Sequence, residues 1–250
     1  MPQAVSQSAF LAQVITLLFL LLRISPGYFV RAQILEPTLV TLSSSAFVDG
    51  KALYISGGEV SPQGLYPSQT FKIDLSVSWN VNRPVFTALK LAPPQIYSPG
   101  AMSADGTKWY LQAEEKGFLY DVLTDSWTHL FSFPGLRPFG RVGATDPSTG
   151  LIYVPHGYLN ADTTVSMLVL NVTSGKFSTN ESGVTILSQT TEYAAAWSQH
   201  LGGMLYVASS GMYTYIPGSG WKNYLNPKDM IAHTKSCLVA AYGGSKMVLF

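Results

Sequence analysis

The chain has 250 residues, of which 47% are hydrophobic and only 12% are charged, with a formal net charge of +1. This apolar content excludes intrinsic disorder, and the absence of a basic cluster excludes nucleic acid as a partner. The 22 glycines, 15 prolines and 14 tyrosines favour an all-β fold over a helical one.

The first 32 residues have the features of a secretory signal peptide. Residues 14–22 form an apolar run that is too short to span a bilayer. The helix-breaking Ser25-Pro26-Gly27 and the small-x-small pattern Val30-Arg31-Ala32 follow it. We therefore expect cleavage after Ala32 and a mature domain over residues 33–250. Because no Lys or Arg precedes the apolar run, a signal anchor is the competing interpretation.

Two N-glycosylation acceptors agree with export from the cell. They are Asn171, in Asn-Val-Thr, and Asn180, in Asn-Glu-Ser. Cys237 is the single cysteine and lies in an apolar run, so we expect a buried, inert thiol. The sequence thus predicts a secreted or cell-surface glycoprotein. We expect membrane attachment only if an anchor lies beyond residue 250 or the signal is not cleaved.

One pattern recurs five times after the signal: a strand of small residues, a glycine-containing turn and a second, apolar strand. The clearest copy ends in Leu53-Tyr54-Ile55-Ser56-Gly57-Gly58. Aligning its Tyr54 with Tyr110, Tyr153, Tyr206 and Val248 places the copies roughly 50 residues apart. The Asp-Gly and Gly-Gly pairs between the strands are strong hairpin signals, because two-residue loops require positive φ angles.

The second half of each unit also repeats, as a strand, a polar turn and a bulky aromatic residue. The aromatic residues are Trp79, Trp127, Phe177 and Trp221, and we expect each to begin an outer strand and to pack against the next unit. Four short strands over this length are typical of one blade of a β-propeller. Since no segment has a sustained 3.6-residue apolar period, helices should be nearly absent.

The predicted blades span approximately residues 39–92, 96–138, 139–186, 190–228 and 233–250. The last unit stops at Phe250, inside its second strand. We therefore expect an all-β propeller of about four and a half four-stranded blades, truncated before the ring closes.

The repeating unit resembles the Kelch repeat, in which an apolar strand, a glycine pair, a Tyr/Asp strand and a tryptophan follow one another. The resemblance is to the Kelch-type propellers grouped with the galactose oxidase central domain, and it covers about residues 39–250. Gly57-Gly58 is the one complete glycine pair after a second strand, so the array is diverged. The resemblance implies a non-catalytic module that binds a protein or carbohydrate ligand on one loop face.

The loops after the second strands gather on one face of such a propeller and supply the candidate binding residues. These residues are Glu59, Tyr66, Glu115, His156, Tyr158 and Asp162. A plainer interpretation is a solvated loop over residues 59–68 and a structural role for His156.

The alternative function is that of an extracellular copper-radical oxidase of alcohols or sugars. The resemblance to galactose oxidase implies copper held by two tyrosines and two histidines, with one tyrosine cross-linked to a cysteine. Cys237 is the only cysteine, and His129, His156, His200 and His233 form no paired motif. We therefore assign no catalytic residue, no metal site and no cofactor, with copper implied only under this alternative.

Overall fold

A computed structural model describes the chain over residues 37–38, 43–48, 51–60, 64–65, 67–78, 84–95, 98–132, 136–138, 142–158, 164–185, 193–208, 211–224, 238–241 and 246–249. The chain divides into two compact units, Met1–Leu35 and Glu36–Phe250. All described residues belong to the second unit.

The described residues form strands and no helix, as the sequence predicted. Blade 1 contains β1 (Ser44–Val48), β2 (Ala52–Ser56), β3 (Thr70–Asp74) and β4 (Phe86–Ala88). Blade 2 contains β5 (Gly100–Met102), β6 (Lys108–Ala113), β7 (Lys116–Asp121) and β8 (Ser126–Ser132). Blade 3 contains β10 (Ala144–Thr145), β11 (Leu151–Tyr158), β12 (Thr164–Asn171) and β13 (Lys176–Thr185), and β9 (Leu136–Pro138) pairs with β11. Blade 4 contains β14 (Tyr193–Ser198), β15 (Gly203–Ala208), β16 (Gly211–Ile216) and β17 (Gly220–Tyr224), and a two-stranded sheet of β18 (Leu238–Ala241) and β19 (Lys246–Leu249) follows.

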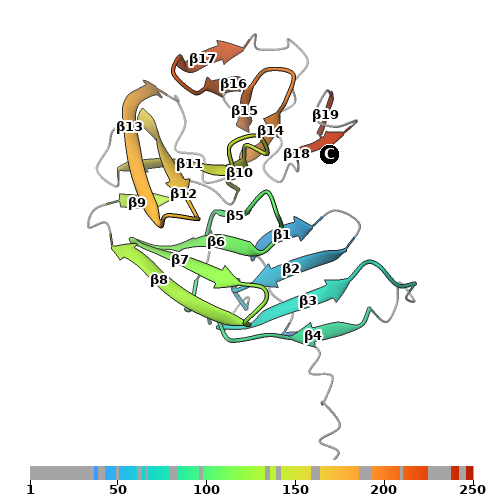
Figure 1. Ribbon diagram of the computed structural model, residues 1–250. Coiled ribbons are helices and arrows are strands. Elements are labelled where there is room, and N and C mark those ends of the chain that lie inside the picture. The colour runs from blue at the N-terminus through green and yellow to red at the C-terminus, as the bar shows by residue number, and fades with distance from the viewer. Residues whose placement is uncertain are drawn as a thin grey trace, which may run out of the picture. The chain divides into compact units, whose positions relative to one another are not determined.

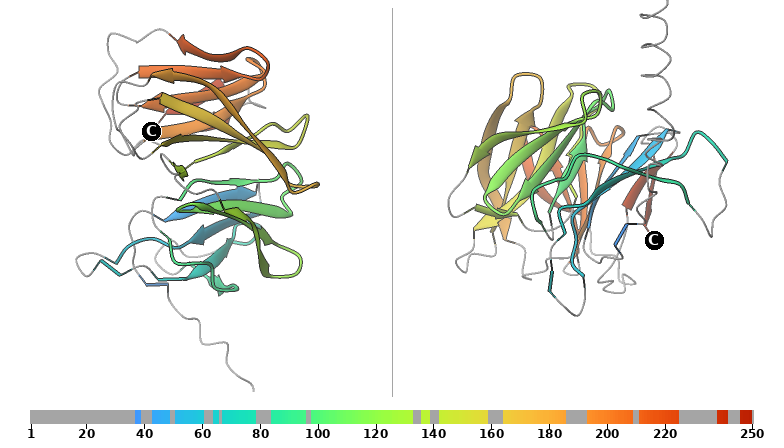
Figure 2. Two further views of the ribbon diagram at one scale, coloured as in Figure 1. Left: turned by 90° about the vertical axis from the view of Figure 1, so that its left-hand side faces the viewer. Right: turned by 90° about the horizontal axis from the view of Figure 1, so that it is seen from below.

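The strands of each blade pair antiparallel in chain order, from an inner to an outer strand (Figure 1). The inner strands of successive blades are in contact, β1 with β5, β5 with β10, and β10 with β14. In the left view of Figure 2 the blades follow one another in chain order, from blue to orange. The architecture is therefore a β-propeller of four blades, and the two-stranded sheet that contacts β14 continues the series. This confirms the predicted fold class.

The hairpins between inner and second strands have the glycine conformations that the sequence predicted. Gly106, Gly150 and Gly202 have φ angles of 71°, 71° and 58°. A side chain at these positions would strain the backbone, which explains why each turn has a glycine there.

Both faces of the central blades carry apolar side chains. We call the face toward the next blade the forward face and the opposite one the back face. On the forward face of blade 1, Tyr54 packs against Trp109 and Tyr120 of blade 2, with ring centroids 6.3 and 6.4 Å apart. On the forward face of blade 2, Tyr110 is fully buried in a cluster with Ile152 of blade 3. Blade 2 is therefore held by both of its neighbours.

One equivalence in the sequence alignment, that of Tyr206, was wrong. Tyr206 lies on the back face of blade 4, in the cluster that contains Tyr153, whereas Tyr54, Tyr110 and Tyr153 lie on forward faces. The reason is register: Tyr206 is the fourth residue of β15, and Tyr54 is the third residue of β2. A shift of one residue along a strand moves a side chain to the opposite face.

The outer-strand aromatic residues pack against the preceding blade, and the predicted contact with the next blade was wrong. Trp127 joins the cluster of blades 1 and 2, Trp221 joins that of blades 3 and 4, and Phe177 lies 4.3 Å from the ring of Phe131 in blade 2. In blade 1 the equivalent position, opposite Ile73, is occupied by Phe86. Trp79 lies outside the described residues.

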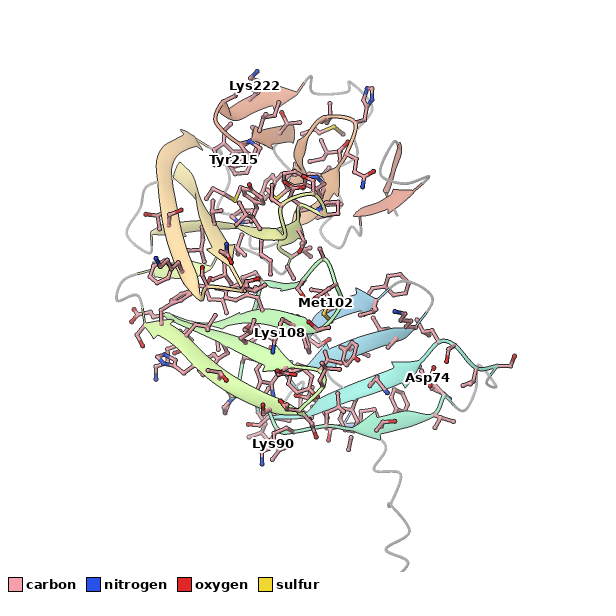
Figure 3. All side chains as sticks on the ribbon, viewed as in Figure 1. Asp74, Lys90, Met102, Lys108, Tyr215 and Lys222 are labelled. Carbon is pink, nitrogen blue, oxygen red and sulfur yellow. The ribbon has the colours of Figure 1, made fainter. Side chains whose placement is uncertain are left out.

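A polar clamp reinforces the contact between blades 1 and 2. The Asp125 carboxylate accepts hydrogen bonds from the Lys90 N–H and the Tyr120 hydroxyl, both at 2.7 Å. The Trp127 indole N–H donates to the Lys90 carbonyl at 3.1 Å. Lys90, labelled in Figure 3, follows β4, so the clamp joins the end of blade 1 to the outer turn of blade 2.

The back face of blade 1 carries the same pattern of apolar residues as the back face of blade 3, but these residues are less covered. Strand register places Leu53, Ile55, Phe71 and Ile73 of blade 1 at the positions that Ile152, Val154, Leu168 and Leu170 occupy in blade 3. The blade 3 residues are all 0% exposed beneath blade 2, whereas Leu53 and Ile55 are only half-buried and Phe47 beside them is 57% exposed. The back face of blade 1 is therefore apolar but incompletely covered.

Truncation of one isoleucine on each of these two back faces should measure the difference in coverage. We expect Ile152→Ala to lower the free energy of unfolding by about 3 kcal/mol, because it leaves a cavity in a fully packed interface. Ile55→Ala should lower it by about 1.5 kcal/mol, since part of that side chain already contacts solvent. Urea titrations of both variants give the comparison. Equal losses would contradict the assigned exposure of blade 1.

Candidate functional site

The inner strands of the four blades surround a cavity of about 580 Å³, which we call the axial cavity. Its wall comes from β1, β5, β10 and β14 and from the turns that connect them to the second strands. Small residues such as Gly100, Ala101, Gly143 and Ala195 line it, which keeps the space between the strands open. Met102, labelled in Figure 3, also lines the cavity, from β5 beside β1.

Larger side chains supply the aromatic surfaces and the polar groups that line the cavity. Phe47 on β1 and Trp197 on β14 are its two aromatic residues, and the former is 57% exposed. Lys51 and Gln199 are exposed polar residues of two inner turns. Trp197 is held in place because its ring stacks on that of Tyr153, 5.1 Å away with an interplanar angle of 25°. A concave space with aromatic surfaces and a few polar groups is suited to reversible binding of a small polar ligand.

The rim of the cavity is rigidified by aspartates that close the inner turns. The Asp105 carboxylate accepts hydrogen bonds from the Ser103 hydroxyl and from Thr107, and these bonds hold the pKa of Asp105 below its usual value. Burial acts to raise the pKa of Asp146, but hydrogen bonds from Ser148 and Thr149 outweigh it, so this pKa is also lowered. These carboxylates are thus occupied by structural bonds.

Two of the loop-face residues predicted from the sequence, Glu59 and Glu115, follow the ends of the second strands β2 and β6. Glu59 follows β2, is half-buried and precedes a bridge between Val60 and Leu65. Glu115 lies in the tight turn between β6 and β7, next to Glu114, whose φ of 51° is unusual for a residue with a side chain. The inner strands and the turns that precede the second strands line the axial cavity, and neither Glu59 nor Glu115 belongs to that lining.

Strand β11 extends further than the sequence suggested. His156 pairs with Ser166 of β12 and with Pro138 of β9, so it lies within the sheet and not at the start of a loop. Tyr158 is the last residue of the same strand. Tyr66 and Asp162 lie outside the described residues, and their proposed role stays a prediction.

Asn171, the first of the two predicted glycosylation acceptors, stabilises the turn that follows β12. The Asn171 side-chain oxygen accepts hydrogen bonds from the Thr173 and Ser174 N–H groups, both at 3.0 Å. Asp121 makes the equivalent bonds in blade 2, so an amide or carboxylate oxygen closes this turn in both blades. Asn180 lies in β13 opposite Met167. Their glycosylation stays a prediction.

A second hollow lies between blades 3 and 4. It has a volume of about 580 Å³ and is lined by Tyr153, Tyr215, Ser178, Thr179 and Pro217 among others. Two blades form this hollow, whereas all four inner strands form the axial cavity, which is therefore the better candidate site.

The sequence analysis missed the axial cavity, although one signal was available. In the sequence analysis each inner strand is described only as a run of small residues, but side chains of a strand alternate between its faces. In β1 the burial alternates from Ser44 to Phe47, so every second residue faces away from the blade 1–blade 2 core. Phe47 is the bulky residue at such a position, and the two-residue alternation of a strand, applied to the sequence from Ser44 to Phe47, could have identified it.

No group of three His, Cys, Asp or Glu side chains suited to a metal ion occurs in the described part of the chain. Cys237, which the copper alternative requires, lies outside that part, so the copper alternative stays a prediction. Within the same described ranges, no helix is long and apolar enough to cross a membrane.

Comparisons with known proteins support the fold alone. No protein-family model and no curated protein matches the chain. The solved structure of YjhT is similar, with a TM-score of 0.54 and 14% sequence identity over 78% of this chain and 68% of that one. Because 363 solved chains match in total, the fold is common and does not define a ligand.

Acid should weaken the protein through the four turn aspartates Asp74, Asp105, Asp121 and Asp146, whose pKa values are all lowered in the fold. A carboxyl with a lowered pKa in the folded state stabilises the fold fully above its unfolded pKa of about 3.9, and this contribution is lost as pH falls through the folded pKa. We therefore expect the contribution of these four carboxylates to the free energy of unfolding to be constant above about pH 5 and to decline below pH 4. Urea titrations at a series of pH values across this range measure the free energy of unfolding.

Asp105→Asn is the matched control, because the amide oxygen still accepts hydrogen bonds but carries no charge. Its unfolding free energy should depend less steeply on pH below 4 than that of the wild type. The same slope in both proteins would contradict the assigned role of Asp105.

Proposed function

We propose that this protein is a Kelch-type β-propeller that acts outside the cell, secreted or on the cell surface, as a non-catalytic binding module. The axial cavity is the observation that carries this proposal, because four blades converge on one concave space. The repeating strand, glycine pair and aromatic turn support the Kelch type. The predicted signal peptide and glycosylation acceptors support the location.

The size and lining of the cavity favour a glycan over a folded protein surface. A volume of about 580 Å³ admits a ligand of a few sugar units. Phe47 offers an exposed ring on which the apolar face of a sugar can lie, and Lys51 and Gln199 offer hydrogen-bond donors to its hydroxyl groups.

Binding of oligosaccharides tests this proposal. We expect the wild-type protein to bind at least one member of an immobilised panel of neutral oligosaccharides. For that member, Phe47→Ala should weaken binding by about tenfold or more, as expected for the loss of an aromatic contact. Lys51→Ala should weaken it less, since the ammonium group is exposed to water.

Glu59→Ala and Glu115→Ala, at the other end of the second strands, are the controls and should leave binding unchanged. Loss of binding in these two variants, with Phe47→Ala unaffected, would move the site to the loop face. Binding to no oligosaccharide, with binding to a protein partner, would contradict the glycan preference.

A further inference from the structure

The second hollow, between blades 3 and 4, has a floor of buried rings and an exposed mouth. On the forward face of blade 3, Tyr153, Val169 and Ser178 line it as one cross-strand row. Tyr215, labelled in Figure 3, and the turn at 217–218 line it from blade 4. The two tyrosines are each 3% exposed, with ring centroids 5.8 Å apart, whereas Ser178 and the turn are exposed. No ionised side chain occurs among the described residues of this lining.

The contact between blades 1 and 2 contains the register equivalents of these residues. Three residues of blade 1 form the same cross-strand row, namely Tyr54, Lys72 and Thr87. In blade 2, Tyr120 pairs with Trp127 of the outer strand. In blade 4, Tyr215 pairs with Trp221 in the same way. The two contacts can therefore be compared position by position.

Between blades 1 and 2 the chain itself supplies peptide groups at this place. Leu89, which follows β4, and Val122, in the turn after β7, both pack against the cluster of the two blades. The Lys90 N–H donates to the Asp125 carboxylate, and the Lys90 carbonyl accepts a hydrogen bond from the Trp127 indole N–H. A short segment with one aliphatic side chain and a bonded backbone thus joins the outer parts of these two sheets.

Between blades 3 and 4 this polar clamp is missing. The turn after β16 comprises residues 217–219, so it is one residue shorter than the turn after β7 at 122–125, and it contains no aspartate. The Trp221 indole nitrogen is buried and has no acceptor among the described residues, whereas Trp127 has the carbonyl of blade 1. The hollow therefore lies where the other contact is closed by the chain's own peptide groups.

We propose that the second hollow binds a short, uncharged peptide segment of another protein. An aliphatic side chain of the segment lies over Tyr153 and Tyr215, and its backbone carbonyls accept hydrogen bonds from the Ser178 and Thr179 hydroxyls. A charged side chain is disfavoured, because the described lining offers no counter-ion and burial of an unpaired charge is costly. The volume of about 580 Å³ lies within the range of ligand pockets.

This peptide site is separate from the axial cavity. The described residues that line the second hollow and those that line the axial cavity have no member in common. The second hollow is built from the second, third and outer strands of blade 3 and from the third strand of blade 4 and its turn, whereas inner strands build the axial cavity. The inference therefore does not depend on glycan binding in the axial cavity.

Amide chemical shifts of the wild-type protein, titrated with a synthetic peptide, test the proposal. The probe is the acetylated and amidated peptide Ala-Leu-Gln-Leu-Ala, which copies residues 88–92 with glutamine in place of the lysine. We expect saturable shifts at Val169, Ser178 and Gly218, and none at Phe47 of the axial cavity. Shifts confined to the axial cavity, or no shift at millimolar peptide, would overturn the proposal.

A pair of matched variants shows whether the hollow itself holds the peptide. Ser178→Tyr should weaken peptide binding about tenfold or more, because the added ring fills the mouth of the hollow. Thr87→Tyr, at the equivalent exposed position of blade 1, is the control and should bind as the wild type does. Unchanged binding by Ser178→Tyr, or equal weakening by both variants, would contradict the site.

A second probe tests the class of ligand. Methyl glucoside, titrated into the wild-type protein, should leave the amides of Val169, Ser178 and Gly218 unshifted. Shifts at these amides with methyl glucoside and not with the peptide would make the hollow a sugar site and overturn the proposal. Both titrations use the wild-type protein, so they decide the question even where Ser178→Tyr does not fold.

Discussion

The central sheets of this propeller are apolar on both faces, and this sets the main constraint on the structure. Tyr110 on the forward face of blade 2 and Trp109 on its back face are both fully buried, each against a different neighbour. A sheet of this kind is stable only between two others, because either face alone would expose a large apolar surface to water. Blade stacking is therefore the interaction on which the rest of the molecule depends.

The axial cavity is a consequence of this stacking. Inner strands must approach one another closely, so they carry glycine, alanine and serine, and the space that these side chains do not fill becomes the cavity. Where a larger residue occurs on an inner strand, as with Phe47, it projects away from the core of blades 1 and 2. Phe47 and Trp197 thus lie on the back faces of their blades and also line the cavity.

The repeat, the strand count and the turn glycines could be predicted from the sequence, because each depends on local chemistry that recurs along the chain. The face of Tyr206 and the direction in which Trp127 packs could not, because both depend on strand register and on contacts between blades. The candidate loop residues followed from the resemblance to Kelch propellers. The axial cavity was missed because it arises from four strands that are far apart in the sequence.

Native-state hydrogen exchange tests the central claim, that each blade depends on its neighbours, most directly. The amides of β6 and β11, whose sheets are covered on both faces, should exchange only through global unfolding and with one common free energy. The amides of β2, in the less covered blade 1, should exchange through an additional opening of lower free energy. Separate opening free energies for blades 2 and 3, or equal protection of β2, would contradict the account.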